Sequence, residues 1–373
     1  MAVYDIATRF IPEDHRIWVL HAGRGKRQFN VFRDQSVAFL EMPGFAATKD
    51  TFEQISAIRQ HLRMSDAIRA FYARPTGNFP SRNPASYPSG VSDDRSFNAN
   101  VGNIKSLFSE ARPGDLLIVP GLGQYSPVLI GEITESFNSE HTVVVSHFEP
   151  EAVPYRPVKW ITTSVEKRHF SKALSRRLEN RHAIIEISTN ELRKEIYDIT
   201  YDNYTLGSYS KSTFFGPIYD SKDPSGILLS IEFIRYFVSA NNAYSRREIE
   251  RFSSMSVKEA IASYYDPSTM RDFSLEFQSP GKILVGITAP LAAIVVALAV
   301  AVSVDTLAYQ DVINTIKIEN SVDNTDEPAI QPAADIYKGI MNSIGEERFN
   351  ETRKMALEAK RAIGFSTDIT RVE

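Results

Sequence analysis

The feature that most constrains the fold is an apolar run over residues 283–304, which contains 22 residues and no charged side chain. An α-helix rises about 1.5 Å per residue, so about 20 apolar residues cross the roughly 30 Å hydrocarbon core of a bilayer. No polar stripe interrupts the run, and a helix that is apolar on all sides is buried in protein or in lipid. The run therefore predicts a transmembrane helix over residues 282–305.

An alternative interpretation places the same residues in the core of a folded domain. Pro290 divides the run, and proline is well tolerated in the first turn of a helix, so a buried helix beginning near this residue also fits. The basic residues Arg271 and Lys282 precede the run, whereas Asp305 follows it. Because basic residues favour the cytoplasmic side of a span, the first interpretation predicts an inner-membrane protein with a cytoplasmic N-terminal domain. The alternative predicts a cytoplasmic protein.

The composition excludes several kinds of site. The chain has no cysteine, which rules out disulfides, cysteine-ligated metals and thiol nucleophiles. The segment Gly-Arg-Gly-Lys at 23–26 lacks the spacer and the hydroxyl of a phosphate loop, and the Glu-x-Lys at 358–360 falls on a helix predicted to be exposed. The seven histidines show no close metal-ligand spacing. We expect a protein that is not an enzyme and that uses no metal and no cofactor.

Periodicity and turn signals divide the chain into four parts. Residues 1–190 alternate short apolar segments with Gly, Pro and Asp turns, which is typical of a small barrel or curved sheet. Residues 191–281 show helical periodicity and are predicted to form a helical connector. After the apolar run, residues 306–373 combine an acidic linker with a polar C-terminal helix that Gly345 interrupts. The predicted fold class is α+β, with a mainly helical second half and one transmembrane helix.

Aromatic and basic residues beside the predicted strands suggest a binding pocket. Rings that enclose a base while Arg or His contacts its edge or phosphate are typical of nucleotide recognition, although each ring also fits a place in the core. Eight basic and two acidic side chains within 156–181 predict a phosphate-binding face or, alternatively, a solvated helix surface. The candidate ligand- or base-binding residues are His21, Arg24, Phe39, Tyr125, Tyr155, Arg156 and Trp160, and the candidate phosphate-binding residues are Lys167, Arg168, Lys172, Arg176 and Arg177.

Five segments in a fixed order carry a resemblance to a known family. They are RIWVLHAGRG at 16–25, VAFL at 37–40, PGDLLIVP at 113–120, VLIGEIT at 128–134 and YRPVKW at 155–160. Together they make residues 15–190 similar to PUA/EVE-like domains, in particular those at the N-terminus of Mrr-type restriction-system proteins and related phage-defence proteins. The resemblance implies a pseudo-barrel whose pocket accepts a flipped, often modified base. The family usually has Gly-Trp after the second strand, where this chain has EMPGF at 41–45.

These expectations combine into one functional prediction and one alternative. The first is a membrane-tethered, non-enzymatic sensor or effector of bacterial defence, whose PUA/EVE-like head binds nucleic acid or a nucleotide-like ligand. The alternative is a soluble specificity subunit of a restriction-like complex, with a buried apolar helix and a separate catalytic chain. The expected partners are nucleic acid or a nucleotide, the membrane in the first case, and either further copies of the chain or partner proteins of a defence system.

Overall fold

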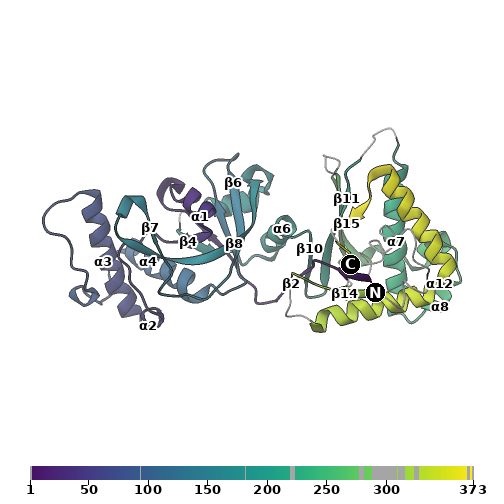
Figure 1. The fold of residues 1–373 in the computed structure, drawn as a ribbon, viewed down its shortest axis with the longest axis horizontal. Helices are drawn as coiled ribbons and strands as arrows, with labels where there is room; N and C mark the ends of the chain where they lie inside the picture. The colour runs from purple at the N-terminus through teal and green to yellow at the C-terminus, as the bar shows by residue number, and fades with distance from the viewer. Residues whose placement is uncertain are drawn as a thin grey trace. The chain divides into compact units, whose positions relative to one another are not determined.

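The chain folds into two compact units, one of which is inserted in the sequence of the other (Figure 1). Residues 14–200 form the inserted unit, and residues 1–13 together with 201–373 form the outer unit. The computed structural model describes residues 2–92, 94–180, 182–218, 223–276, 281–287, 309, 316–322, 327–367 and 370–371.

The inserted unit is built on a curved sheet that forms a half barrel. The strand order is β4-β8-β6-β5-β3-β9, with β7 paired to β8, and β3 pairs with β5 in parallel. The 15-residue β8 pairs with β4 near its start and with β6 along its second half, which carries the curvature. The strands are β3 (Ile17–Leu20), β4 (Val37–Phe39), β5 (Leu116–Pro120), β6 (Pro127–Ile133), β7 (Thr142–Val144), β8 (Ala152–Glu166) and β9 (Ile184–Glu186).

Helices enclose the apolar core of this sheet. Ile58, Leu62 and Ile68 share one face of α3 and are buried, as on an amphipathic helix. A π-helical turn, Ser106–Glu110, continues α4 and ends shortly before β5. The α-helices are α1 (Phe29–Gln35), α2 (Lys49–Glu53), α3 (Ile55–Ala73), α4 (Arg95–Lys105), α5 (Lys172–Leu178) and α6 (Asn190–Thr200), and the 3-10 turns are η1 (Arg24–Lys26), η2 (Pro84–Ser86), η4 (Ser146–Phe148) and η5 (Lys167–His169).

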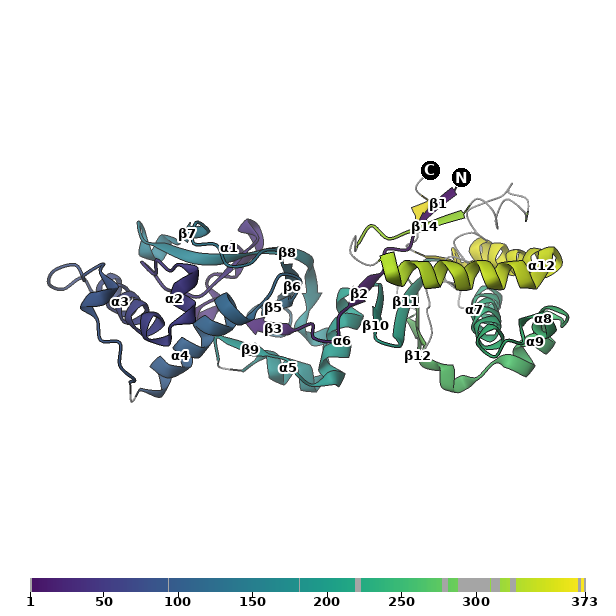
Figure 2. The same cartoon turned by 90° about the horizontal axis from the view of Figure 1, so that it is seen from below.

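The outer unit combines two sheets with a pair of long helices. One sheet has the order β12-β13-β11-β10-β2, with β15 on β11, and the other has the order β14-β1-β16. Helix α12 packs along α7 (Figure 1 and Figure 2). The elements are β1 (Ala2–Asp5), β2 (Arg9–Ile11), β10 (Asn203–Leu206), β11 (Tyr209–Gly216), α7 (Ser225–Ser245), α8 (Ile249–Ser253), α9 (Val257–Tyr264), η6 (Pro267–Thr269), β12 (Met270–Glu276), β13 (Gly281–Ile287), β14 (Ile316–Glu319), α12 (Glu327–Ile363), β15 (Ser366–Thr367) and β16 (Thr370–Arg371).

The predicted transmembrane helix over residues 282–305 is wrong. The start of the apolar run forms β13, which lies between β11 and β12 in the sheet. Ile283, Val285 and Ile287 occupy alternate positions along this strand and are buried, which is the period of two expected of a strand. In the sequence this period is hidden because it lies within a longer apolar run. Residues 288–304 lie outside the described residues. No helix in the described part of the chain has the length and apolarity that crossing a bilayer requires, so the predicted inner-membrane localisation is wrong as well.

The unit boundaries also differ from the predicted ones. The strands β1 and β2 belong to the outer unit, which resumes at Tyr201, because β2 pairs in parallel with β10. The predicted helical connector over 191–281 contains the strands β10, β11 and β12 besides the helices α6 to α9. The predicted interruption of the last helix at Gly345 is confirmed, since this residue has φ 73° inside α12.

Candidate ligand-binding site

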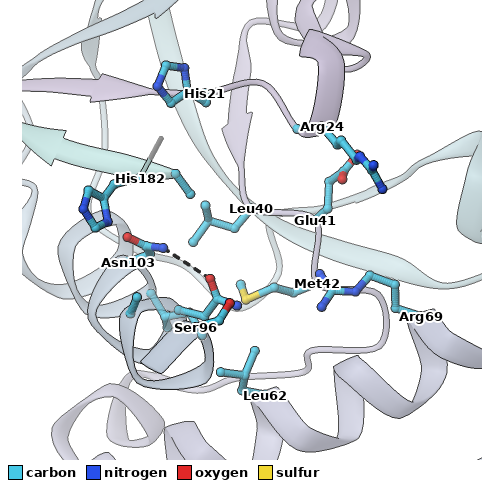
Figure 3. A pocket seen from close by; sticks show the side chains of 15 residues that line it. His21, Arg24, Leu40, Glu41, Met42, Leu62, Arg69, Ser96, Asn103 and His182 are labelled. Carbon is cyan, nitrogen blue, oxygen red and sulfur yellow. Dashed lines mark hydrogen bonds between the residues drawn. The ribbon is translucent and has the colours of Figure 1, made fainter. Parts of the chain in front are cut away.

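The inserted unit contains a cavity of about 480 Å³ between the ends of three strands and two helices. The segments that follow β3 and β4 and the segment before β9 form one side, and α3 and α4 form the other (Figure 3). We call this cavity the pocket. Its lining residues are His21, Gly23, Arg24, Leu40, Glu41, Met42, Leu62, Arg69, Ser96, Ala99, Asn100, Asn103, Ile104, His182 and Ala183.

Helix α4 supplies the amide groups of the pocket. Asp94 caps the helix by accepting from the Ser96 amide at 2.7 Å, which fixes where the helix begins. Asn100 and Asn103 then fall one turn apart on the same face, and the Asn103 Nδ2 donates to Asn100 Oδ1 at 3.3 Å (Figure 3). Asn103 is buried, and its side chain retains hydrogen-bonding capacity toward the cavity.

A carboxylate is fixed at the opposite wall. The Arg27 guanidinium donates to Glu41 from Nε at 2.5 Å and from Nη2 at 2.6 Å, and the Gln28 Nε2 adds a bond of 2.6 Å. Gly23 allows this close packing, because a Cβ there would lie 2.7 Å from Glu41 Oε1 and the backbone has φ 72°. Glu41 is therefore a pre-oriented acceptor at the pocket wall.

A group of three basic side chains, His21, Lys26 and Lys167, lies at the β3 end of the pocket; we call it the basic cluster. The His21 amide extends the β3–β9 pairing by donating to the Ala183 carbonyl at 2.8 Å. Its ring Nδ1 contacts the Lys26 Nζ, while its Nε2 is buried and has no hydrogen-bond partner among the described residues. Burial, followed by the charges of Lys26 and Lys167, lowers the pKa of His21 to about 4, and an interaction with the Asn180 backbone opposes this shift. Burial and the Lys167 charge likewise lower the pKa of Lys26 to about 8.

An exposed loop over residues 121–126 borders the basic cluster. The Lys167 amide donates to the Ser126 carbonyl at 3.3 Å, which ties the loop to η5. Tyr125 is 75% exposed, and the Arg168 guanidinium lies over its ring at 5.3 Å from the centroid. Leu122 in the same loop is 70% exposed. The loop and η5 thus present an aromatic ring with a cation above it, an arrangement suited to stacking on a base.

The structure brings some of the predicted ligand-binding residues together. His21 and Arg24 line the pocket, and Tyr125 lies on the adjoining loop. Among the predicted phosphate-binding residues, Lys167 belongs to the basic cluster and Arg168 to the Tyr125 surface. Lys172 and Arg176 are exposed on α5, whereas Arg177 donates to the Glu186 carbonyl at 2.9 Å.

Five of the predicted ligand-binding residues do not line the pocket: Tyr125 lies on the adjoining loop, and the other four are part of the sheet. Phe39 is 1% exposed and packs edge-to-face on Phe32 in the core. Tyr155 stacks on His141, and the Trp160 Nε1 donates to the Phe32 carbonyl at 2.9 Å. Arg156 is buried and bonds backbone carbonyl groups, as described below. Phe39 on β4 pairs with Tyr155 on β8, Arg156 pairs with Ala38, and Trp160 pairs with Gly131 of β6. The half barrel therefore takes these side chains into its interior or its packing surfaces.

Sequence reasoning missed the residues that α3, α4 and the β4 end contribute. Arg69, Asn100 and Asn103 are polar residues on amphipathic helices, so the sequence places them on solvent-exposed faces. No local sequence pattern indicates that two helices and a sheet edge enclose them. Glu41 stands within the EMPGF segment that departs from the family pattern, which was the one signal available. In the described part of the chain, no three His, Cys, Asp or Glu side chains gather as metal ligands.

Comparisons with protein-family models, with curated proteins and with solved structures return no match.

Proposed function

We propose that the inserted unit is a non-catalytic nucleic-acid-binding module that takes one nucleotide of a single strand into the pocket. The observation that carries the proposal is the composition of the pocket wall. Amide groups and a fixed carboxylate lie on α4 and at the β4 end, and the basic cluster lies at the β3 end. A base offers donors and acceptors on its edge and a phosphate on its sugar, so a nucleotide matches both parts.

The size and the charge of the unit support this assignment. Small-ligand pockets commonly enclose about 300–1,000 Å³, and the 480 Å³ here falls in that range. Residues 14–200 carry 24 basic and 21 acidic side chains, against 18 and 25 in the rest of the chain. The pocket thus belongs to the more positive unit, as a polyanionic ligand favours.

The pocket wall also suggests how the base would be read. Apart from two histidines, no ring is present among the lining residues, so base selection would rest on hydrogen bonds from Asn103, Asn100 and Glu41. Stacking would occur outside, where a neighbouring base has the exposed Tyr125 ring available. This division predicts that a strand binds better than a free nucleotide.

The test is fluorescence anisotropy of the whole chain with short single-stranded RNA and DNA at low salt. Arg24→Ala removes an exposed pocket cation, and Tyr125→Ala removes the stacking ring. Stacking contributes about 1–3 kcal/mol per base, so Tyr125→Ala is expected to weaken binding by about 5- to 100-fold. Arg112→Ala is the matched control, because Arg112 pairs with Asp14 before β3, at the opposite end of that strand from His21. Absence of binding by the wild type, or equal affinities for all variants, would overturn the proposal.

A further inference from the structure

The three side chains of the basic cluster have one ion-pair partner among the described residues, the carboxylate of Glu179. Lys167 is 5% exposed, and its Nζ lies 3.7 Å from Glu179, whose side chain is half exposed. Glu41, which lines the same pocket, already bonds Arg27 and Gln28. The remaining charged or titratable groups that line the pocket with His21 are Arg24, Arg69 and His182, all of them basic.

The geometry at His21 shows which atom has an unused donor. A lysine ammonium only donates, so its contact with His21 Nδ1 makes that nitrogen the acceptor. A neutral ring then carries its proton on Nε2. This buried N–H has no well-aligned acceptor among the described residues, where the Asn180 backbone interacts with the ring outside hydrogen-bond geometry. A buried donor without a well-aligned acceptor beside two lysines is the arrangement that an anionic oxygen would complete.

We propose that the basic cluster is the phosphate subsite of the pocket, and that a nucleotide phosphate binds there with uptake of a proton by the cluster. The phosphate oxygens accept from His21 Nε2 and from the ammonium groups of Lys26 and Lys167. The proton comes from solvent, and no covalent bond changes. This inference rests on the proposed function, since it names the ligand group that occupies one end of the pocket.

Proton uptake follows from the charge balance. Without a ligand, burial and the charge of Lys167 lower the pKa of Lys26 to about 8, so this ammonium loses its proton between pH 7 and pH 9. A bound phosphate reverses that balance and returns the pKa of Lys26 toward 10.5. If the return is complete, linkage gives a loss of affinity of about tenfold between pH 7 and pH 9, a range in which a phosphodiester does not titrate.

Isothermal titration calorimetry of the whole chain in phosphate-free buffers tests the subsite. The probes are the four nucleoside monophosphates, the four matching nucleosides and a short single-stranded oligonucleotide. Near pH 8 we expect the binding enthalpy of phosphate-bearing probes to change with the ionisation enthalpy of the buffer, and the nucleosides to bind at least tenfold more weakly. Tighter binding of the oligonucleotide identifies the source as a strand phosphodiester, and tighter binding of a monophosphate identifies a free nucleotide.

Lys26→Met is the variant that isolates the cluster, and Lys194→Met is its matched control on α6, where Lys194 pairs with Asp198. Lys26→Met should remove the pH dependence between 7 and 9 and weaken phosphate-bearing probes tenfold or more, while Lys194→Met leaves both unchanged. Without a ligand, Lys26→Met should also raise the pKa of His21 above about 4 in an NMR titration, which confirms that the variant is folded.

The outcomes separate the two proposals. Equal binding of nucleosides and monophosphates, or a buffer-independent enthalpy, overturns the phosphate subsite and leaves the pocket as a base-binding site. A wild-type chain that binds none of the probes overturns both.

Discussion

Replacing Arg156 with methionine gives a sharp test of how the inserted unit is held together. The Arg156 side chain is 1% exposed, and its Nη1 donates to the Leu107 carbonyl at 2.8 Å and to the Ala111 carbonyl at 3.0 Å. Its Nη2 donates to the Glu135 carbonyl at 2.6 Å. One guanidinium thus joins the π-helical turn before β5 to the segment that follows β6.

The magnitude follows from opposing terms. Hydrogen bonds to a charged group each contribute about 1.5–3 kcal/mol, and three are lost. Against this, burial lowers the pKa of Arg156 to about 10, which corresponds to roughly 3 kcal/mol of cost that the methionine does not incur. The net loss of unfolding free energy is therefore about 1.5–6 kcal/mol, a range that includes the loss typical of breaking other buried charged groups.

The assay is urea unfolding followed by tryptophan fluorescence. The chain has two tryptophans, Trp18 and Trp160, and both lie in the inserted unit, so the signal reports on that unit. Arg112→Met, which removes an exposed ion pair with Asp14, should cost less than about 1 kcal/mol. A change below 1 kcal/mol for Arg156→Met at an unchanged urea dependence would refute the structural role.

Three further changes test other parts of the structure. The folded pKa of His21 lies below its ordinary 6.5, so the contribution of the neutral ring to stability is complete above pH 6.5 and is lost as pH falls toward 4. For this half-buried ring we expect a loss of about 1–2 kcal/mol in urea unfolding across that pH range. The His21→Gln variant should not show this loss. Gly131→Ala places a Cβ 2.5 Å from the Lys159 carbonyl and 2.9 Å from the Trp160 Cα, so it should force β6 and β8 apart and lower stability by about 2 kcal/mol or more in the tryptophan assay. Gly226→Ala places a Cβ 2.7 Å from the Ile363 Cγ2, and this clash should outweigh the gain of about 1 kcal/mol in helix propensity; a thermal melt by circular dichroism that shows higher stability would contradict the contact.

Local signals were sufficient for much of the inserted unit. The Pro-Gly-Asp turn at 113–115 predicts a strand start at Leu116, which is where β5 begins. The Asp115 carboxylate accepts from the Trp18 Nε1 at 3.0 Å and from the Arg112 amide at 2.9 Å, so the residues of the turn also connect two strands. Turn chemistry is local in sequence, which is why it can be read without the fold.

The failures come from pairings that no local pattern contains. The apolar run is long enough to suggest a helix, yet its start pairs with β11, about 70 residues earlier in the chain. Phe39 and Arg156 are residue types that also occur in base-binding sites. Here Phe39 is a ring of the core, and the buried Arg156 donates to backbone carbonyl groups. Composition does not distinguish these uses, because burial is decided by the neighbours that the sheet brings together.

The pairing of β1 has a consequence for how the chain folds during synthesis. Ala2 of β1 pairs with Ile316, and Tyr4 pairs with Arg371, so this strand is synthesised more than 300 residues before its partners. Residues 14–200 contain all partners of their own sheet and can fold as soon as they emerge. At about 5–20 residues per second, the distance from residue 200 to residue 371 corresponds to a delay of roughly 10–35 seconds. During that time β1 lacks its complete set of partner strands, whereas β2 can pair with β10 once residue 206 has been made. Chaperones that recognise extended segments would therefore act on β1 of the nascent chain.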